Sequence, residues 1–280
     1  MIISNDIIET FENALIQHGS YNDRVYLLKM FGDIAPGFPQ RLIEFAQGYS
    51  KIFAKIPARA WAGFGDAGFV VEARIPLFYQ GREDALFVCF YLQPWRAIEK
   101  NEQMAEVEGV KLAKKQATVE IRPCLLGDIP QMAELYASVF PTYPFPIQNA
   151  GYLAKTLGEG VEFWCAEIAG DIVALSSAEQ DTANENVEMT DFATAPRWRG
   201  YGLGAELLKV MEEAMRKKGM KTAYTIAREK SVGMNAIFAR AGYSVGGRLI
   251  NNTNIAGGIE SMVVWYKTFN RTEHEISNSG

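Results

Sequence analysis

The sequence is poor in the residues that most often bind metals. Its 280 residues include two histidines, His18 and His274, and three cysteines, Cys89, Cys124 and Cys165. No pair of cysteines has the spacing of metal ligands, and two histidines cannot build a His-rich zinc site. We therefore expect no metal. A Ser-His-Asp triad would have to rest on His18 and is disfavoured. The odd number of isolated cysteines is typical of reduced thiols, which favours the cytosol.

Long hydrophobic runs and an excess of positive charge are also missing. No run of about 18 apolar residues predicts a transmembrane helix, and the first 19 residues lack the basic start and apolar centre of a secretory signal. The 28 Lys and Arg against 33 Asp and Glu give a net charge of −5, which argues against a general nucleic-acid binder. Hydrophobic residues make up 48%, which predicts a folded globular protein.

A charged stretch at 97–117 divides the chain. It has few large apolar residues and separates two segments rich in aromatic and β-branched residues, so it reads as a solvated helical linker. We expect an N-terminal α/β domain with this linker at 1–116, a second domain at 117–270 and a polar tail at 271–280.

The second domain shows a clear alternation of strands and helices. Asp128 is a candidate N-cap for the first of its helices, and Gly219 is a stop signal for another. The predicted strands are 117–123, 161–168, 172–180, 186–194, 221–227, 243–250 and 260–269, and the predicted helices are 128–140, 204–218 and 233–242. This order predicts a mixed α/β domain around one sheet.

The N-terminal segment repeats part of that order. Strands are predicted at 22–31, 50–57, 69–79 and 83–92, and helices at 36–48 and 59–68. Both copies contain a Phe followed four residues later by Gly and an aromatic residue, at Phe64 and at Phe238. We interpret this segment as a degenerate half-copy of the second domain, without its glycine-rich turn. The sequence leaves three roles open for this segment: capping a pocket, pairing with the other sheet, or forming a dimer interface.

The richest chemical signal lies at 197–204, with the sequence Arg-Trp-Arg-Gly-Tyr-Gly-Leu-Gly. The segment follows a predicted strand and opens a predicted helix. Glycines let successive backbone N–H groups turn toward one point, and a helix N-terminus adds unsatisfied amides and positive potential. The segment therefore predicts a phosphate or pyrophosphate site. It matches neither the dinucleotide pattern G-x-G-x-x-G nor a P-loop.

Arg197, Gly200 and Gly202 fit the Arg/Gln-x-x-Gly-x-Gly/Ala signature of the GNAT superfamily, and residues 117–270 resemble a GNAT domain. The resemblance implies an acyl-CoA N-acyltransferase fold with acetyl-CoA as acetyl donor. It also implies that the backbone of 199–204 holds the pyrophosphate and that a splayed strand holds the pantetheine arm. The implied donor-binding residues are Phe192, Ala193, Thr194, Arg199, Gly200, Tyr201, Gly202, Leu203 and Gly204.

A more specific resemblance covers nearly the whole chain. Segments such as 16–30 and 48–57 before the linker, and 225–243 and 246–262 after it, resemble the β-lysine N6-acetyltransferase family, which partners lysine 2,3-aminomutase. The reaction it implies converts acetyl-CoA and β-lysine, (3S)-3,6-diaminohexanoate, to N6-acetyl-β-lysine, a compatible solute. The implied partner is a small-molecule amine. A homodimer is common among such folds but is not fixed by the sequence.

Two carboxylates on the strand before the glycine loop are candidate catalytic groups. Glu188 lies six residues before Thr194 and suits a general base, because the attacking amine must lose a proton. Asp191 suits binding of an ammonium group. Strand alternation predicts that the two side chains point to opposite faces unless the strand bulges.

Other positions suggest how an acceptor would be held. Arg228, Arg248 and the run from Asn251 to Asn254, expected between two late strands, are candidates for the substrate carboxylate, with Asn252 and Asn254 the strongest in that run. Tyr143 lies in a Pro-rich loop that would cover the acceptor.

One position departs from the superfamily pattern. Many GNAT enzymes have a tyrosine acid where this chain has Phe238, so Tyr243, Tyr224, water or unassisted departure of the thiolate remain as options. The alternative functions are acetylation of another amine and a non-catalytic module that binds acetyl-CoA.

Overall fold

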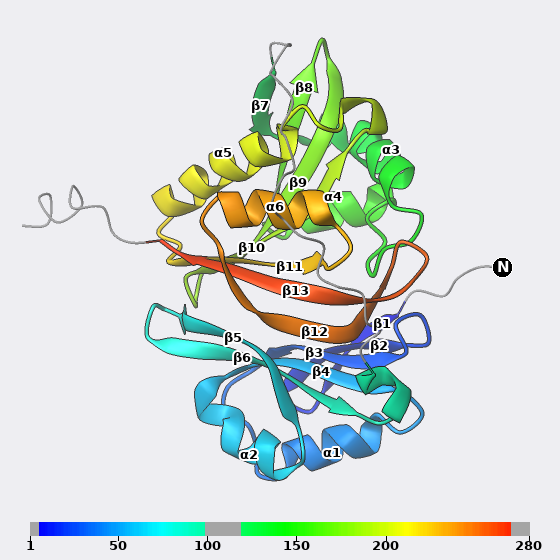
Figure 1. Cartoon of the computed structure of the whole chain (residues 1–280), viewed down its shortest axis with the longest axis vertical. Helices are drawn as coiled ribbons and strands as arrows, with labels where there is room; N and C mark the ends of the chain where they lie inside the picture. The colour runs from blue at the N-terminus through cyan, green and yellow to red at the C-terminus, as the bar shows by residue number, and fades with distance from the viewer. Residues whose placement is uncertain (1–5, 99–118, 270–280) are drawn as a thin grey trace, which may run out of the picture.

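The computed structural model describes residues 6–98 and 119–269, and in these residues the strands form a single 13-stranded sheet (Figure 1). The strand order is β1-β2-β3-β4-β6-β5-β12-β13-β11-β10-β9-β8-β7. The predicted mixed α/β architecture is therefore present. The predicted tail, most of the predicted linker and the boundary between the two predicted domains lie outside the described residues.

Residues 6–98, here called the N-terminal half, carry six strands and two α-helices. Their bounds are β1 (Ile7–Phe11), β2 (Ala14–Gly19), β3 (Arg24–Met30), α1 (Phe38–Phe45), β4 (Lys51–Pro57), α2 (Trp61–Asp66), β5 (Val70–Tyr79) and β6 (Glu83–Tyr91). The helices α1 and α2 cover one face of the sheet, where Phe38, Leu42 and Phe64 join an apolar cluster (Figure 1).

Residues 119–269, the C-terminal half, carry the predicted domain. The bounds are β7 (Glu120–Pro123), α3 (Ile129–Val139), α4 (Ala150–Gly158), β8 (Glu162–Ile168), β9 (Asp171–Asp181), β10 (Asn186–Thr194), α5 (Leu203–Lys217), β11 (Thr222–Arg228), α6 (Val232–Arg240), β12 (Ser244–Ile255) and β13 (Gly258–Thr268). Apolar side chains of α5 and α6 cover one face of this sheet, and α3 and α4 cover the other face at β8 and β9.

Strands β8 to β13 of the C-terminal half follow the same order as β1 to β6 of the N-terminal half. In each set, three antiparallel strands are followed by a helix and by a fourth strand that pairs parallel to the third. A second helix and an antiparallel pair of strands complete the set. The pairing registers also correspond, since Tyr26 lies opposite Phe53 in β3–β4 and Glu188 lies opposite Tyr224 in β10–β11. The structure thus shows a repeated topology, in line with the interpretation as a half-copy.

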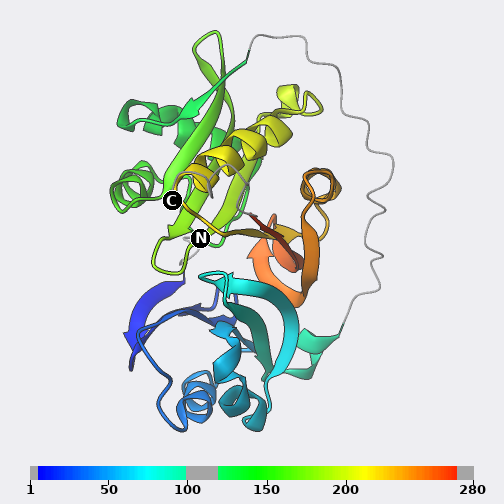
Figure 2. The same cartoon turned by 90° about the vertical axis from the view of Figure 1, so that its left-hand side faces the viewer.

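The halves meet where β5 pairs with β12. Gly247 of β12 lies opposite Ala73 of β5, and a Cβ atom at Gly247 would come within 2.2 Å of the Glu72 carbonyl oxygen. Only glycine allows this close approach. Figure 2 shows the N-terminal elements as one lobe and β7 to α5 as the other, with β12 and β13 at the junction.

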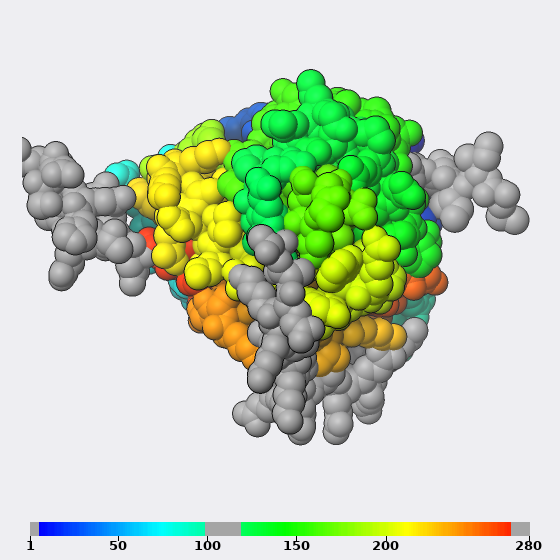
Figure 3. All heavy atoms as spheres, turned by 90° about the horizontal axis from the view of Figure 1, so that it is seen from above, coloured from blue at the N-terminus to red at the C-terminus, as the bar shows by residue number. Residues whose placement is uncertain are grey.

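Beyond this seam, the helix-free face of the N-terminal sheet packs on the C-terminal sheet. Phe53, Phe78 and Phe87 of the N-terminal half share one apolar cluster with Tyr224 and Leu249 of the C-terminal half. The N-terminal half therefore occupies the part of the C-terminal sheet that α3 and α4 leave uncovered. Seen from above, the surface is formed largely by α3, α4 and α5 of the C-terminal half (Figure 3).

Three local expectations differ from the structure. The run Asn251–Asn254 lies inside β12, and the turn comes later, at Ala256 and Gly257. Strands β1 and β2 and helix α4 were not predicted, because their short patterns mix polar and apolar residues. Asp128 occupies the predicted N-cap position of α3, but its side chain makes no capping hydrogen bond, since the carboxylate pairs with Arg122 and accepts from the Leu125 amide.

Candidate active site

The glycine loop joins β10 to α5 as the sequence predicts. Gly200 has φ 85° and Gly202 has φ 81°, a left-handed conformation that favours glycine. Gly202 is the N-cap of α5 and has no side chain to satisfy the first amides of the helix. Open space surrounds the position where a Cβ would stand at both glycines. A ligand can therefore approach the backbone closely here.

The backbone amides of this loop are available for an anion. Those of Gly200, Tyr201 and Gly202 donate no hydrogen bond to any residue of the described ranges. Gly204 and Leu203 have another structural role. A Cβ at Gly204 would press on Ile237 of α6 at 3.2 Å, and the Leu203 side chain is buried in the core. Their amides, at the first turn of α5, still face the loop.

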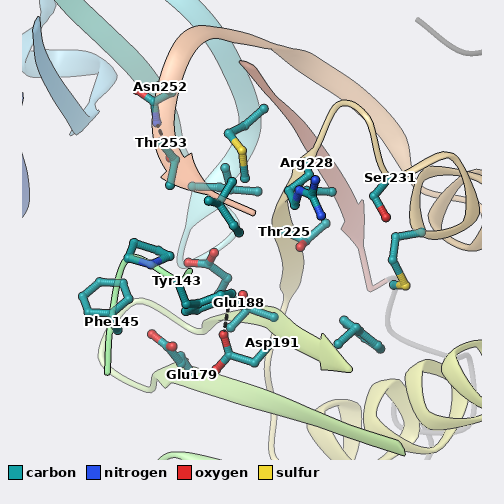
Figure 4. Close-up of a pocket in the computed structure, with 18 of the residues that line it drawn as sticks. Tyr143, Phe145, Glu179, Glu188, Asp191, Thr225, Arg228, Ser231, Asn252 and Thr253 are labelled. Atoms are coloured by element: carbon teal, nitrogen blue, oxygen red, sulfur yellow. Dashed lines mark hydrogen bonds between the residues drawn. The ribbon is translucent and has the colours of Figure 1, made fainter. Parts of the chain in front are cut away.

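The strands β10 and β11 separate at the level of this loop. They pair only from Asn186 to Glu188, opposite Thr222 to Tyr224, while β10 continues to pair with β9 as far as Thr194. A pocket of about 200 Å³ opens where the strands diverge. Its lining comes from β3 and β4, the loop after α3, β9 to β13, and α6 (Figure 4).

Glu188 and Asp191 both line this pocket, because the exception allowed by the prediction, a bulge in the strand, is present. The β9–β10 register shifts between Thr190 and Ala193, and Asp191 has φ 57°. Such a bulge adds one residue to the strand and reverses the alternation beyond it. The bulge therefore turns Asp191 to the face that Glu188 occupies.

A third carboxylate joins them. Glu179 of β9 lies directly opposite Glu188 in the register and lines the same pocket. Asp191 is 9% exposed and accepts hydrogen bonds from the Tyr143 hydroxyl and, at 2.7 Å, from Ser177. Figure 4 shows Glu179, Glu188 and Asp191 converging on one side of the cavity. The pocket thus has a strongly acidic wall that suits a cationic ligand.

Burial raises the pKa of these carboxyl groups. Desolvation raises the pKa of Asp191, against the hydrogen bonds from Tyr143 and Ser177. Desolvation also raises the pKa of Glu188, against the charge of Lys55 and a hydrogen bond from Tyr224. Glu179 lines the pocket but is exposed, so water screens part of the effect. Partial desolvation and the charges of Glu188 and Asp191 raise its pKa. Carboxylates with raised pKa values are stronger proton acceptors than free ones.

A cation from the N-terminal half lies beside Glu188. Lys55 of β4 donates to the Tyr224 hydroxyl at 2.6 Å, and its ammonium lies 4.7 Å from the centre of the Tyr224 ring. Desolvation lowers the pKa of Lys55, against the attraction of Glu188. Lys55, Tyr224 and Glu188 therefore form a polar chain that crosses the contact between the halves.

The predicted substrate-binding residues have different positions. Tyr143, Arg228 and Asn252 line the pocket, although Arg228 is paired with Glu260 at 2.9 Å. Arg248 and Asn254 do not line it. Arg248 pairs with Glu229 at 2.6 Å, and the Asn254 side chain donates to the Tyr21 carbonyl at 2.7 Å.

The predicted donor-binding residues of β10 are also divided. Phe192 lines the pocket, whereas Ala193 is buried and, with Thr194, pairs with β9. Their backbone edge toward β11 has no strand partner in the described ranges. The Arg199 side chain reaches back to the Thr194 carbonyl at 3.4 Å.

Phe238 lines the pocket and is 1% exposed. The alternative Tyr243 is buried away from the pocket, where its ring lies 5.5 Å from the Lys267 ammonium. Of the two tyrosines considered, only Tyr224 has its hydroxyl beside a pocket carboxylate.

Sequence reasoning missed Glu179, Tyr26 and Arg24, which line the pocket. It also missed Ser177, which donates to Asp191, and Lys55, which donates to Tyr224. A signal existed for Lys55, because a lysine inside the apolar strand 50–57 needs a buried partner. Glu179 could have been found by placing 172–180 antiparallel to 186–194. The contribution of Arg24 and Tyr26 depends on how the halves pack, which no local pattern reports.

Within the described ranges, no three His, Cys, Asp or Glu side chains are placed to hold a metal ion. In the same ranges, no helix has the length and apolar character needed to cross a membrane. All three cysteines are buried and free.

Comparison with known proteins agrees with this geometry. The family model described as acetyltransferase (GNAT) family matches residues 129–243. The chain is 35% identical over 275 residues to beta-lysine N(6)-acetyltransferase of Methanococcus maripaludis, an alignment that covers 93% of this chain and 98% of that protein. It is 38% identical over 145 residues to the protein of the same name from Methanosarcina mazei, covering 52% and 54% of the two chains. It is also 26% identical over 272 residues to N-acetyltransferase YodP of Bacillus subtilis, covering 91% and 95%.

The fold, the glycine loop and these matches define an N-acetyltransferase with the GNAT fold. Within that class, the chain belongs to the β-lysine N6-acetyltransferase family. The predicted fold class, enzyme class and family are confirmed.

Proposed function

We propose that this enzyme transfers the acetyl group of acetyl-CoA to the N6 amine of β-lysine and releases N6-acetyl-β-lysine. The observation that carries the proposal is the acidic wall formed by Glu179, Glu188 and Asp191 where β10 and β11 separate. The similarity to an enzyme named for this reaction, over 93% of the chain, supports the same acceptor.

The acetyl donor fits the glycine loop. The amides of Gly200 to Gly204, at the loop and the start of α5, would hold the pyrophosphate, since they have no other acceptor in the described ranges. The unpaired edge of β10 after Glu188 would hold the pantetheine arm by backbone hydrogen bonds. When bound, acetyl-CoA supplies a thioester, which an amine can attack directly.

Glu188 is the proposed general base. A lysine-type amine has a pKa near 10.4, so about one molecule in 2,500 is neutral at pH 7. Glu188 accepts the proton as the new C–N bond forms and the C–S bond breaks with departure of the CoA thiolate. Its raised pKa makes it a better acceptor, and its position beside the last β10–β11 pair puts it at the edge of the opening.

Asp191 has a different proposed role. It holds the second ammonium group of the acceptor, because two hydrogen bonds already fix its carboxylate. Tyr143, which donates one of them, would thereby help to position the acceptor.

The test is CoA release from acetyl-CoA by the purified enzyme. We would offer β-lysine, α-lysine, ornithine, spermidine and a lysine-containing peptide in parallel and identify the products by mass. Selective acetylation of β-lysine at N6 is the expected result. Turnover of another amine would keep the transferase but change the acceptor. Binding of acetyl-CoA without turnover on any amine would favour a non-catalytic module, for which Phe238 in the pocket would be the first explanation.

A further inference from the structure

A buried arginine from the N-terminal half reaches the same pocket. Arg24, the first residue of β3, is 3% exposed and lines the cavity. Its Nη1 donates to the Asn252 carbonyl at 2.5 Å and to the Thr253 hydroxyl at 3.0 Å. Its guanidinium also lies 5.1 Å from the centre of the Tyr26 ring. These contacts fix the guanidinium at the junction of the two halves.

No carboxylate of the described ranges lies within ion-pair distance of this guanidinium, and the charge of Asp6 acts on it only from further away. Within the described ranges Arg24 forms no ion pair, its buried Nε has no hydrogen-bond partner, and its Nη2 donates no hydrogen bond. Arg228, the other arginine of the lining, is paired with Glu260. A buried guanidinium without a carboxylate is costly unless a ligand supplies one. Desolvation lowers the pKa of Arg24 to about 10, so the group stays protonated at neutral pH.

The arginine lies across the cavity from the acidic wall. Figure 4 shows Asn252 and Thr253 on one side and Glu179 and Asp191 on the other. Because Arg24 is hydrogen-bonded to both Asn252 and Thr253, its guanidinium lies on the same side of the cavity as these two residues. The pocket is therefore polarised, with three carboxylates from the C-terminal half facing a guanidinium from the N-terminal half.

We infer that Arg24 binds the carboxylate of the acceptor, so that the enzyme selects free amino acids with a terminal amine. The inference rests on the proposed function and deepens it, because it assigns recognition of the carboxylate to the N-terminal half. A guanidinium with unused N–H groups matches a carboxylate in shape and charge. A polyamine has no carboxylate, and a lysine within a peptide has none near its backbone, so both would leave Arg24 without a partner.

The test compares two acceptors in wild type and variants. β-Lysine and 1,4-diaminopentane, which is β-lysine without its carboxylate, would each be assayed by CoA release in wild type, Arg24→Gln and Arg24→Lys. Arg74→Gln, the same change at an exposed arginine of β5, is the matched control. The expected loss for Arg24→Gln is roughly 10- to 100-fold in kcat/KM for β-lysine, carried by KM. Turnover of 1,4-diaminopentane and the KM for acetyl-CoA stay unchanged, and Arg24→Lys recovers part of the loss.

The outcomes separate this inference from the proposed function. Two results would overturn the inference and leave the proposed function intact. One is that wild type acetylates β-lysine with no preference over 1,4-diaminopentane. The other is that Arg24→Gln leaves the KM for β-lysine unchanged. Equal losses on both acceptors indicate a structural role for Arg24 and also overturn it. Failure of wild type to acetylate any amine overturns both. Because the wild-type comparison needs no substitution, the test remains decisive even where Arg24→Gln fails to fold.

Discussion

Glu179 and Glu188 stand directly opposite each other on β9 and β10. Like charges at opposed positions of an antiparallel pair destabilise a sheet, and here the charge of Glu188 helps to raise the pKa of Glu179. The arrangement costs stability in the free enzyme and gains an electrostatic partner when a cationic acceptor enters. Such a cost is expected at a binding site of the proposed kind and not in a sheet optimised for folding alone.

The role of Glu188 can be tested by Glu188→Gln. We expect kcat to fall by roughly 10²- to 10⁴-fold at neutral pH, the usual contribution of a general base. The loss should shrink toward high pH, where solvent deprotonates the amine. The pH profile of CoA release checks both statements. Glu213→Gln, which removes an exposed carboxylate of α5, should have no effect, and a pH-independent loss in Glu188→Gln would assign the proton transfer to another group.

The glycine loop can be tested with two glycines of the same conformation. Gly202 has φ 81° and Gly219, at the other end of α5, has φ 83°, and both have open space around the Cβ position. Substitution by Ala should cost each variant about 1 kcal/mol of stability from backbone strain. Only Gly202→Ala should raise the KM for acetyl-CoA, because only there does the backbone face the donor. Equal KM values in the two variants would move the pyrophosphate elsewhere.

The buried carboxylate of Asp191 predicts how stability depends on pH. Its pKa is raised in the folded state, so the folded enzyme binds more protons there than the unfolded chain does. The contribution of Asp191 to the free energy of unfolding is fully present below the pKa of the unfolded chain, 3.8. This contribution is lost as pH rises through the pKa of the folded state. Urea unfolding from pH 4 to 8 should therefore show a weaker decline of stability with rising pH in Asp191→Asn than in wild type.

Asp128 is the control with the opposite sign. A hydrogen bond from Arg122 lowers the pKa of this carboxyl group, so its contribution is present above 3.8 and is lost as pH falls through the folded value. Asp128→Asn should destabilise the enzyme at neutral pH and not at the acid end. If both variants changed the pH dependence in the same direction, the assignment for Asp191 would be wrong.

The junction of the halves depends on a buried ion pair. Glu72 of β5 accepts from Lys51 at 2.8 Å, from the Ile250 amide at 2.9 Å and from the Tyr91 hydroxyl, and Lys51 is fully buried. Glu72→Ala would leave that ammonium uncompensated and should cost about 3–5 kcal/mol. Thermal unfolding measures the loss. Glu213→Ala, which breaks an exposed pair with Lys217, should leave the midpoint unchanged.

The sequence was informative where a signal is local. The glycine loop, the helix that follows it and the alternation of strands depend on residues close in the chain, and the structure has them at the predicted places. The bulge at Asp191 was beyond such reasoning, because the simple period of two assumes a regular ladder. Nothing in the residues around Thr190 marks the irregularity.

Contacts between the halves could not be predicted from the sequence either. Arg24 and Asn252 are 228 positions apart, and their contact depends on the approach of β5 to β12 at Gly247. The same packing directs Asn254, which sequence reasoning favoured, to the Tyr21 carbonyl. Arg248 pairs instead with Glu229 of its own half.

The two halves join through corresponding strands. β5 and β12 each form the edge of the strand order in their own half, and they pair antiparallel. This is how two subunits meet in an isologous dimer, except that one chain here supplies both. In a true homodimer any change on one side of the interface appears on the other as well. A single chain is free of that restriction, so the position of Glu188 in one half is occupied by Tyr26 in the other, and that of Tyr224 by Phe53. The proposed acceptor has an ammonium group at one end and a carboxylate at the other, and such an asymmetric enclosure suits it.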